Sequence, residues 1–598
     1  MAQKSEVRDG MRIDWDMPIT MDDAIVLRAD IYRPPQNGRY PVILSYGPYA
    51  KGLAFQEGYS EIWKKLAERY PRALEGSTNK YMSWEVVDPE KWVPDGYVCV
   101  RVDSRGAGRS PGYLDPFSRR ETRDFYLCIE WAAKQPWSNG KIGVLGISYF
   151  AMNQWDVASL QPPHLAAIIP WEGAADWYRD ICRHGGIMST FFGHWIGDEV
   201  HTGRFPGQVW RLLKIPFEGT GVQHGVGKRG PVNPNTGEPV AGPETLSDEQ
   251  LAANKTGVAA AILAHPLDDE YHRERSPDWS KVTVPMLSCA NWGGQGLHSR
   301  GNFEAYIRAA SKQKWLEVHG KEHWAEFYTP YGLALQKRFF DHFLKDVKND
   351  WKDQTSVQLQ IRTLNGFVQR AENEWPLART RWTRLYLDAS DHSLSRKRVD
   401  AEHSVEYDAL GDGVTFSTTP LEQETEITGP VAAKLFISSS TMDADLFLVL
   451  RLFAPDGSEV VFQGASDPHM PLSQGWLRAS HRKLDPRLSR EHRPYHTHDL
   501  VEPLKPGEVY ELDVEIWPTC IVAPAGYRIG LTVRGKDYEY PGEPALELWG
   551  SFVEVLKGSA DFLHDDPRDR PAEIFGGRNT IHAGGERAAY LLLPIIPK

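Results

Sequence analysis

The stretch KIGVLGISYFAMNQWDVAS, residues 141–159, decides the fold of this chain. Its first part is short and apolar, as a buried β-strand is, and its last part carries apolar residues at helical spacing. Gly146-Ile147-Ser148 lies between them, at a sharp strand-to-helix turn of the nucleophile-elbow type, which exposes a serine hydroxyl at the start of a helix. Phe150 stands where the commoner motif has its second glycine, and Ala151 follows. We therefore predict that Ser148 is a nucleophile; the alternative is an ordinary helix-capping serine.

Strands and helices alternate on both sides of this turn. Short β-like runs precede it at 25–34, 40–47 and 96–103, followed by a helical stretch at 122–137. The apolar strand LAAIIPW (165–171) follows the turn, and the alternation returns between 284 and 345. Such a pattern is typical of an α/β fold with a largely parallel sheet. With the elbow, it predicts an α/β-hydrolase domain.

Changes in composition and in predicted secondary structure divide the chain into four segments. Residues 1–172 and 281–348 are the expected first and second parts of the hydrolase core. Residues 173–280 are aromatic and helical, then rich in Gly, Pro and Asn, which indicates an inserted cap or lid. Residues 349–598 read as a series of short strands with turn signals, which predicts an all-β sandwich of the jelly-roll type.

Composition narrows the possible functions. The 598 residues are 41% hydrophobic and 25% charged, as in ordinary globular proteins, and the net charge is −12 with no basic run. Nucleic acid and membrane are therefore not expected partners. The five cysteines lack paired spacing, and the charged N-terminal residues lack the apolar core of a signal peptide. We expect a cytoplasmic protein that acts on a small molecule. Assembly into a homo-oligomer stays open.

A serine hydroxyl needs a base, and in α/β-hydrolases the catalytic histidine follows the last core strand. His323, in VHGKEHWAEF, has that position, and the intervening residues leave room for a cap. His319 is the rival, although it lies nearer the strand end, where a structural role is common. We predict that His323 is the base.

Several further stretches resemble one family, the cocaine-esterase-like and X-Pro dipeptidyl-peptidase-like serine hydrolases, which include α-amino acid ester hydrolases. The resemblance covers nearly the whole chain. It rests on SYGPYAKG around Tyr49, DSRGAGRSPG (103–112), PWSNGKIGVLGISYFA, HPLDDEYH (265–272), His323, and in the C-terminal part MDADLFLVLRLFAPDG, GWLRASHR and LKPGEVYELDVEIWPT. It implies an α/β-hydrolase with a helical cap and a C-terminal jelly roll beside the site.

The resemblance also implies roles for single residues. It makes Ser148 the nucleophile and His323 the base, and it makes the Tyr49 hydroxyl and the Tyr149 backbone N–H the oxyanion hole. Such preorganised donors are worth about 3–4 kcal/mol each. One stretch departs from the family: where a Gly-Trp-Tyr-Asp motif usually carries the catalytic acid, this chain has Asn-Trp-Gly-Gly-Gln, residues 291–295.

A substitute acid is therefore expected elsewhere. Glu172 directly follows the strand LAAIIPW, so it should emerge at the same edge of the sheet as Ser148. Other α/β-hydrolases draw their acid from this next strand, and an unpaired carboxylate in so apolar a setting would be costly. We predict that Glu172 is the acid and should contact His323. Three rivals stay open: Asp269, Glu304 and Glu322.

Other residues carry weaker signals. Four tryptophans could line a substrate pocket or pack in the cap and core: Trp155, Trp171, Trp177 and Trp292. His265, His272 and His298 lack a metal-binding pattern, and DSRGAGRSPG lacks the lysine of a phosphate loop, so no metal or cofactor is expected.

Together these residues predict a serine hydrolase that cleaves a carboxylic ester, or an amide, of a small to medium substrate through an acyl-enzyme. An X-Pro-type peptidase is less expected, because carboxylates to hold a free α-amino group are not evident in the sequence. The rival class is a non-catalytic binding protein that has lost its acid.

Overall fold

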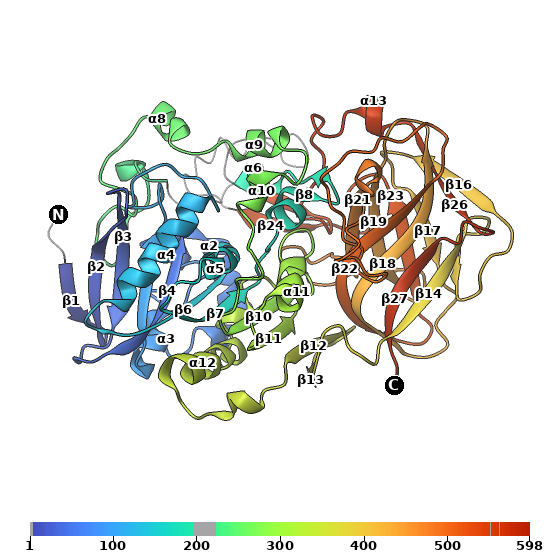
Figure 1. Ribbon diagram of the computed structural model, residues 1–598. Coiled ribbons are helices and arrows are strands. Elements are labelled where there is room, and N and C mark those ends of the chain that lie inside the picture. Colours follow the sequence, from blue (N-terminus) through green and yellow to red (C-terminus); the bar gives the residue numbers. More distant parts are fainter. Residues whose placement is uncertain (1–3, 196–222, 550–551, 561) are drawn as a thin grey trace.

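The computed structural model describes residues 4–195, 223–549, 552–560 and 562–598, and two large sheets organise them (Figure 1). The first sheet has eleven strands in the order β1-β2-β3-β5-β4-β6-β7-β10-β11-β12-β13. The strands from β5 to β12 run parallel, and β1 to β3 and β13 are antiparallel to their neighbours. The bounds of this sheet's strands are β1 (Lys4–Arg8), β2 (Met11–Thr20), β3 (Val26–Arg33), β4 (Tyr40–Gly47), β5 (Val98–Asp103), β6 (Ser138–Ile147), β7 (Leu165–Trp171), β10 (Met286–Asn291), β11 (Lys314–His319), β12 (Val357–Thr363) and β13 (Gly366–Glu372).

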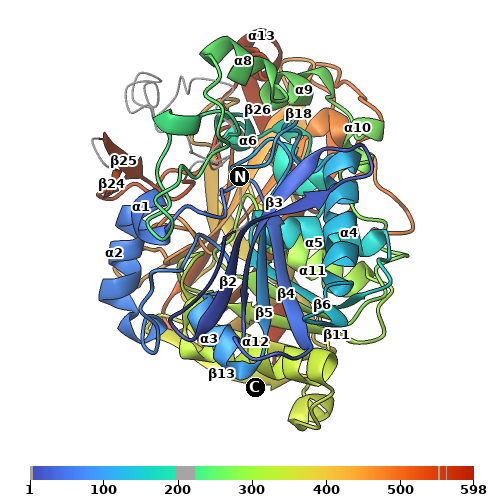
Figure 2. The ribbon, with the colours of Figure 1, turned by 90° about the vertical axis from the view of Figure 1, so that its left-hand side faces the viewer.

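Helices cover both faces of this sheet (Figure 2). One face packs against α4 (Arg119–Ala133), α5 (Tyr149–Ser159) and α11 (Ser299–Arg308), and the other against α3 (Pro89–Trp92) and α12 (Pro330–Lys345). Their apolar side chains and those of the strands form two buried clusters, one on each side. Parallel strands buried on both faces consist of continuous apolar runs, and such runs are easy to recognise in the sequence. The predicted α/β-hydrolase domain is confirmed.

The second sheet belongs to the C-terminal domain and has twelve strands, beginning at β14 and ending at β27. Its strands curl into a β-sandwich around one apolar cluster, as predicted (Figure 1). Their bounds are β14 (Arg381–Asp388), β15 (Ser393–Ser395), β16 (His403–Asp408), β17 (Val414–Ser417), β18 (Thr425–Ser439), β19 (Asp445–Phe453), β20 (Glu459–Val460), β21 (Ser473–Arg478), β22 (Tyr510–Ala523), β23 (Arg528–Arg534), β26 (Arg578–Ala583) and β27 (Tyr590–Ile596). A separate hairpin joins β24 (Ala545–Trp549) to β25 (Phe552–Leu556).

The segment between β7 and β10 stands above the carboxyl edge of the hydrolase sheet (Figure 1). Its helices and strands are short: η3 (Trp177–Cys182), β8 (Arg183–His184), β9 (Ile187–Met188), α6 (Phe191–Trp195), η4 (Gly227–Arg229), α8 (Asp248–Ala253), α9 (Val258–Ala264) and α10 (Glu270–Arg273). It occupies the place expected of the cap, although residues 196–222 of it lie outside the described residues.

Two strands that follow the predicted boundary at residue 349 belong to the first sheet. β12 pairs with β11, and β13 pairs with β12, so both extend the hydrolase sheet. Their short strands look the same in either sheet, because a strand pattern does not reveal its pairing partner. Within the described part of the chain, every helix is too short or too polar to cross a membrane.

Candidate active site

Ser148 occupies the predicted strand-to-helix turn. It follows β6, precedes α5, and has φ 75° and ψ −101°, a conformation that is strained for any residue with a Cβ. The turn is tight: a Cβ on Gly146 would lie 2.3 Å from the Cβ of Phe150. The Ser148 N–H donates to the Trp171 carbonyl at 3.3 Å, which ties the turn to β7. The serine is therefore held away from the sheet at the start of a helix.

Four neighbouring parallel strands end around this serine. Glu172 directly follows β7, Asn291 ends β10, and His319 ends β11, with His323 four residues beyond. Carboxyl ends of parallel strands meet at one edge of a sheet, which is where such folds bind ligands. Glu172 is fully buried and has φ 51°, so its backbone too leaves the usual strand conformation.

Glu172 lies between two histidines, as the expected acid should. One carboxylate oxygen is 2.9 Å from His323 Nδ1, and the other is 2.9 Å from His319 Nε2. Asn291 Nδ2 donates to the second oxygen at 3.2 Å. The predicted contact between Glu172 and His323 is therefore present, and the asparagine of the altered Asn-Trp-Gly-Gly-Gln stretch supports it.

The imidazole next to Ser148 is that of His298 and not that of His323. His323 Nε2 lies 2.9 Å from Glu85 Oε1, whereas His298 Nε2 lies 2.9 Å from Ser148 Oγ. The two imidazoles stack with centroids 4.7 Å apart and planes 5° apart. As the predicted base, His323 would have to turn its second ring nitrogen toward the serine; it does not, because His298 fills the space beside the hydroxyl.

Carboxylates and imidazoles alternate along a buried row behind the serine. The row runs Glu85, His323, Glu172, His319, Glu317, with each neighbouring pair joined by a contact of 2.7–2.9 Å. All five side chains are buried. An isolated charge at this depth would be very costly, so each imidazole and carboxylate in the row depends on its neighbours.

This row shifts the ionisation of its members. Burial alone would lower the pKa of His323, but Glu172 and Glu85 outweigh it and raise the pKa to about 10. Burial alone would raise the pKa of Glu172, yet His323 and His319 lower it to about 2. Burial raises the pKa of Glu85 to about 7. Burial and the neighbouring His323 hold the pKa of His298 well below its usual range. The two stacked imidazoles therefore differ: His323 is held protonated and His298 neutral.

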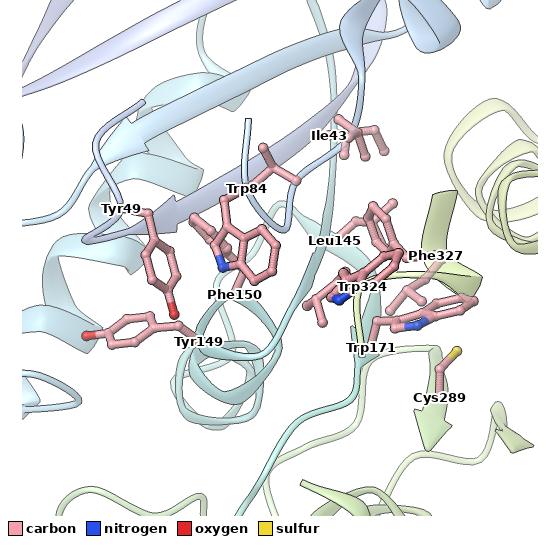
Figure 3. Close-up of a cluster of buried hydrophobic side chains, with 14 of the residues drawn as sticks. Ile43, Tyr49, Trp84, Leu145, Tyr149, Phe150, Trp171, Cys289, Trp324 and Phe327 are labelled. Carbon is pink, nitrogen blue, oxygen red and sulfur yellow. The ribbon is translucent and has the colours of Figure 1, made fainter. Parts of the chain in front are cut away.

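The predicted oxyanion donors flank the serine on its other side. Burial raises the pKa of Tyr49 well above its usual value, although the neighbouring Ser148 side chain acts to lower it, so the hydroxyl keeps its proton. Figure 3 shows this hydroxyl directed toward Tyr149. Tyr149 is the first residue of α5, where backbone N–H groups lack partners within the helix. Its own hydroxyl donates to Glu121 at 2.7 Å.

The loop DSRGAGRSPG (103–112) has a structural role. Asp103 accepts backbone hydrogen bonds from Arg109 at 2.8 Å and from Lys51 at 2.6 Å. A Cβ on Gly108 would lie 2.4 Å from the Asp103 carboxylate, so only glycine fits there. The loop thereby closes around Asp103 and fixes the segment that carries Tyr49.

The four tryptophans have different surroundings. Trp155 packs against Trp279 on the face of the sheet away from Tyr49, and Trp292 packs against Phe303 and Trp375. These two fit the core alternative. Trp171 stacks on His319 and packs against Phe327, so it supports the buried row (Figure 3).

Trp177 is the tryptophan of the four that joins the aromatic cluster next to the serine. It packs against Phe117 and Phe192, and Phe117 in turn packs against Tyr149. Trp195 of α6 contacts both Tyr49 and Tyr149. An apolar wall therefore lies beside Tyr49 and Tyr149, the predicted oxyanion donors.

The rival acids are engaged elsewhere. Asp269 caps α10 by accepting from the Tyr271 N–H and contacts His265. Glu304 pairs with Arg493 at 3.0 Å, and Glu322 accepts from Tyr70 at 2.6 Å and pairs with Arg69. Each has a partner of its own, so Glu172 is the one of the four sequence-predicted carboxylates that contacts the imidazole pair.

Glu172, His298 and His323 are also the group of described residues whose ligand atoms lie close enough, within 4.8 Å, to suggest a metal ion. The ring planes of the two histidines are parallel, so their nitrogen lone pairs point along parallel planes instead of toward one point. Metal sites need converging donors. This geometry is that of a hydrogen-bonded cluster.

Sequence reasoning missed two residues of the site, Glu85 and His298. Glu85 lies in a segment without regular structure, although its backbone carbonyl accepts from the Ile147 N–H at 3.0 Å. His298 was considered only as a metal ligand. Its position shortly after β10, at the edge where Ser148 emerges, is the signal that could have identified it.

Comparisons with known proteins identify the family. Residues 23–325 match the family model for X-Pro dipeptidyl-peptidase of the S15 family, and residues 349–592 match the C-terminal non-catalytic domain of X-Pro dipeptidyl-peptidase. The cocaine esterase of Rhodococcus sp. (strain MB1 Bresler) is 24% identical, over 97% of this chain and 98% of that protein.

Solved structures show the same architecture. A CocE/NonD family hydrolase from Staphylococcus aureus is 31% identical, with a TM-score of 0.80 over 98% of this chain and 94% of that one. An α-amino acid ester hydrolase, 16% identical, has a TM-score of 0.61 over 97% and 96% of the two chains and shares the fold. With its elbow serine, its hydrolase sheet and its C-terminal β-sandwich, this chain belongs to the S15 family of serine hydrolases.

Proposed function

We propose that this hydrolase cleaves carboxylic esters of small to medium size through an acyl-enzyme on Ser148. The observation that carries the proposal is the 2.9 Å contact between the hydroxyl of the strained elbow serine and an imidazole. A nucleophile within hydrogen-bond reach of a base is the arrangement that nucleophilic catalysis needs, and here the base stacks on His323, which two carboxylates contact.

The chemistry follows from the positions of the groups. Ser148 Oγ attacks the ester carbonyl carbon while its proton passes to an imidazole nitrogen. The carbonyl oxygen becomes an oxyanion, which the Tyr49 hydroxyl and the Tyr149 N–H are positioned to receive. The intermediate collapses, the C–O bond to the alcohol breaks, and the imidazolium returns the proton to the leaving oxygen. Water then attacks the acyl-enzyme by the same route and releases the acid.

We assign the catalytic acid role to Glu172. Its contact with His323, its complete burial and its pKa of about 2 make it a permanent anion beside the imidazole pair. The base is one of the two stacked imidazoles: His323, which the sequence predicts, or His298, which contacts the serine.

Esters are favoured over X-Pro peptides by the state of the nearby carboxylates. A peptidase of that type needs free carboxylates for the substrate α-amino group. Glu121 is occupied by the Tyr149 hydroxyl and the Phe117 N–H, and Glu85 and Glu172 by His323. The aromatic wall of Phe117, Trp177 and Trp195 suits an apolar group. The relative named cocaine esterase supports the same choice.

The proposal is tested by labelling and by a substrate panel. A fluorophosphonate probe should label the wild-type chain at Ser148 and leave Ser148→Ala unlabelled. A series of p-nitrophenyl acyl esters and the matching anilides, with an X-Pro anilide included, should show ester turnover well above amide turnover. Absence of labelling favours the non-catalytic reading, and faster cleavage of the X-Pro anilide favours the peptidase.

We also propose a cytoplasmic location. All five cysteines are buried and free, which fits a reducing compartment. Separation of the native cell into fractions, followed by immunodetection of the chain, checks this location.

A further inference from the structure

We propose that His298 is the general base that takes the proton of Ser148, and that His323 is a positioning residue held between two carboxylates. This inference rests on the proposed ester hydrolysis and names the residue that makes it work. It departs from the assignment expected from chain order, in which the histidine after the last core strand is the base.

Direct contact favours His298. Its Nε2 lies 2.9 Å from Ser148 Oγ, within the range that proton transfer requires. It is buried, with 5% of its surface exposed, and it precedes the first residue of α11. The backbone N–H of His298 donates to the Gly294 carbonyl at 3.1 Å, so the loop after β10 fixes its position.

The same loop explains why the family carboxylate is missing. Gly293 lies against the β-sandwich, where a Cβ would come 2.4 Å from the Cα of Gly464. A Cβ on Gly294 would lie 3.2 Å from the Ser299 N atom, so this turn also has little room. The loop that lacks the acid is therefore the loop that delivers His298 to the serine.

Both ring nitrogens of His323 are already engaged. Nδ1 contacts Glu172 and Nε2 contacts Glu85, each at 2.9 Å. When both carboxylates are ionised, both nitrogens carry protons and the ring is an imidazolium. When Glu85 is protonated, its hydroxyl donates to Nε2 and occupies the lone pair. In either arrangement His323 offers the serine no free lone pair, whereas a general base needs one.

Because the two rings stack, the charge of His323 acts on the ionisation of His298. His298 is faced by His323 and by Glu172, with Glu85 behind His323. The positive charge of His323 and the burial of the site disfavour a second imidazolium, so His298 stays neutral and able to accept a proton. After it takes the proton from Ser148 Oγ, it is a strong acid and returns the proton readily to the alkoxide leaving group.

The pH dependence of kcat/KM separates the two bases. A base must be unprotonated, so the rate falls as the pH drops through its pKa in the free enzyme. With His298 as the base, activity should persist below pH 6, because the pKa of His298 lies below its usual range. With His323 as the base, activity should appear only in alkaline solution, because its pKa is raised to about 10.

Variants of the full chain complete the test, with p-nitrophenyl acetate as the substrate. His298→Ala should lose about 10³-fold or more in kcat and regain part of it with added imidazole. His323→Gln should lose less, and its acid limb should move to higher pH, because removal of the stacked positive charge raises the pKa of His298. A residue with a merely structural role would not move that limb. Circular dichroism and thermal unfolding identify any variant that fails to fold.

The outcomes distinguish this inference from the proposed function. Retention of activity by Ser148→Ala overturns the proposed function itself. An inactive Ser148→Ala together with His298→Ala within tenfold of the wild type overturns only the assignment of the base. An acid limb of the wild type above pH 8 also overturns it, and that measurement needs no variant. EDTA added to the wild type should leave the rate unchanged; a loss restored by Zn²⁺ would instead make the cluster a metal site.

Discussion

At the scale of single residues, the site depends on one buried anion. Glu172 is the central carboxylate of the row and contacts both His319 and His323. Removing one partner from a buried charged pair typically costs about 3–5 kcal/mol, because the other charge stays behind without compensation. Catalysis should suffer as well, since the imidazole pair loses the charge that orients it.

Glu172→Gln is therefore expected to lower kcat by about 10-fold to 100-fold, because the anion that holds the stacked imidazole pair in place is lost and a small displacement at a catalytic group costs that much. The substitution keeps the shape of the side chain, so the fold should persist with a lower melting temperature. Asp269→Asn is the matched control, because Asp269 is a helix cap. Steady-state kinetics and thermal unfolding measure both effects. Near-normal kcat in Glu172→Gln would remove Glu172 from the mechanism.

At the scale of secondary structure, the strand-to-helix turn at Ser148 stores strain. A serine with φ 75° and ψ −101° pays of order 1–3 kcal/mol for its conformation, whereas glycine adopts it without a Cβ penalty. The turn survives because its backbone is fixed by bonds to Trp171 and from Ile147 to Glu85.

Ser148→Gly should therefore abolish turnover and raise the free energy of unfolding by about 1 kcal/mol, because relief of strain exceeds the extra entropy of glycine in the unfolded chain. Ser148→Ala is the control: it also abolishes turnover but keeps the Cβ, so its stability should match the wild type. Chemical denaturation of the three proteins measures the difference. Equal stability of the glycine and alanine variants would contradict stored strain at this turn.

The secondary-structure elements also show what the sequence could predict. The elbow, the flanking strands and Glu172 were predictable because each follows from a local pattern, an apolar run or the residue directly after one. His298 and Glu85 were not, because each reaches the serine from an irregular segment whose path is set by packing. His323 was placed correctly beside Glu172, but its second partner, Glu85, lies far away in sequence. Local sequence patterns predict the strands and helices, whereas tertiary contacts determine that His298, and not His323, lies next to Ser148.

At the scale of the whole molecule, the β-sandwich takes part in building the site. The Ala465 N–H of the sandwich donates to the Gly293 carbonyl at 3.0 Å, and the His323 N–H donates to the Ala465 carbonyl at 2.9 Å. One residue of the C-terminal domain thus holds both loops that supply the stacked imidazoles. The site is therefore shared between the domains, although the side chains with chemical roles come from the hydrolase domain.

Gly293→Ala tests this connection. The new Cβ would lie 2.4 Å from the Cα of Gly464 and 2.9 Å from the N atom of Ala465, closer than van der Waals contact allows. Because both are backbone atoms, the clash can be relieved only if a loop moves. We expect kcat to fall about 10-fold to 100-fold, because a displacement of about 1 Å at a catalytic group costs that much, with a melting temperature lower by a few degrees. Gly257→Ala is the control, since its Cβ would meet only Ala260 at 3.9 Å. If Gly293→Ala kept full activity, the β-sandwich would be a neighbour of the site and not a part of its support.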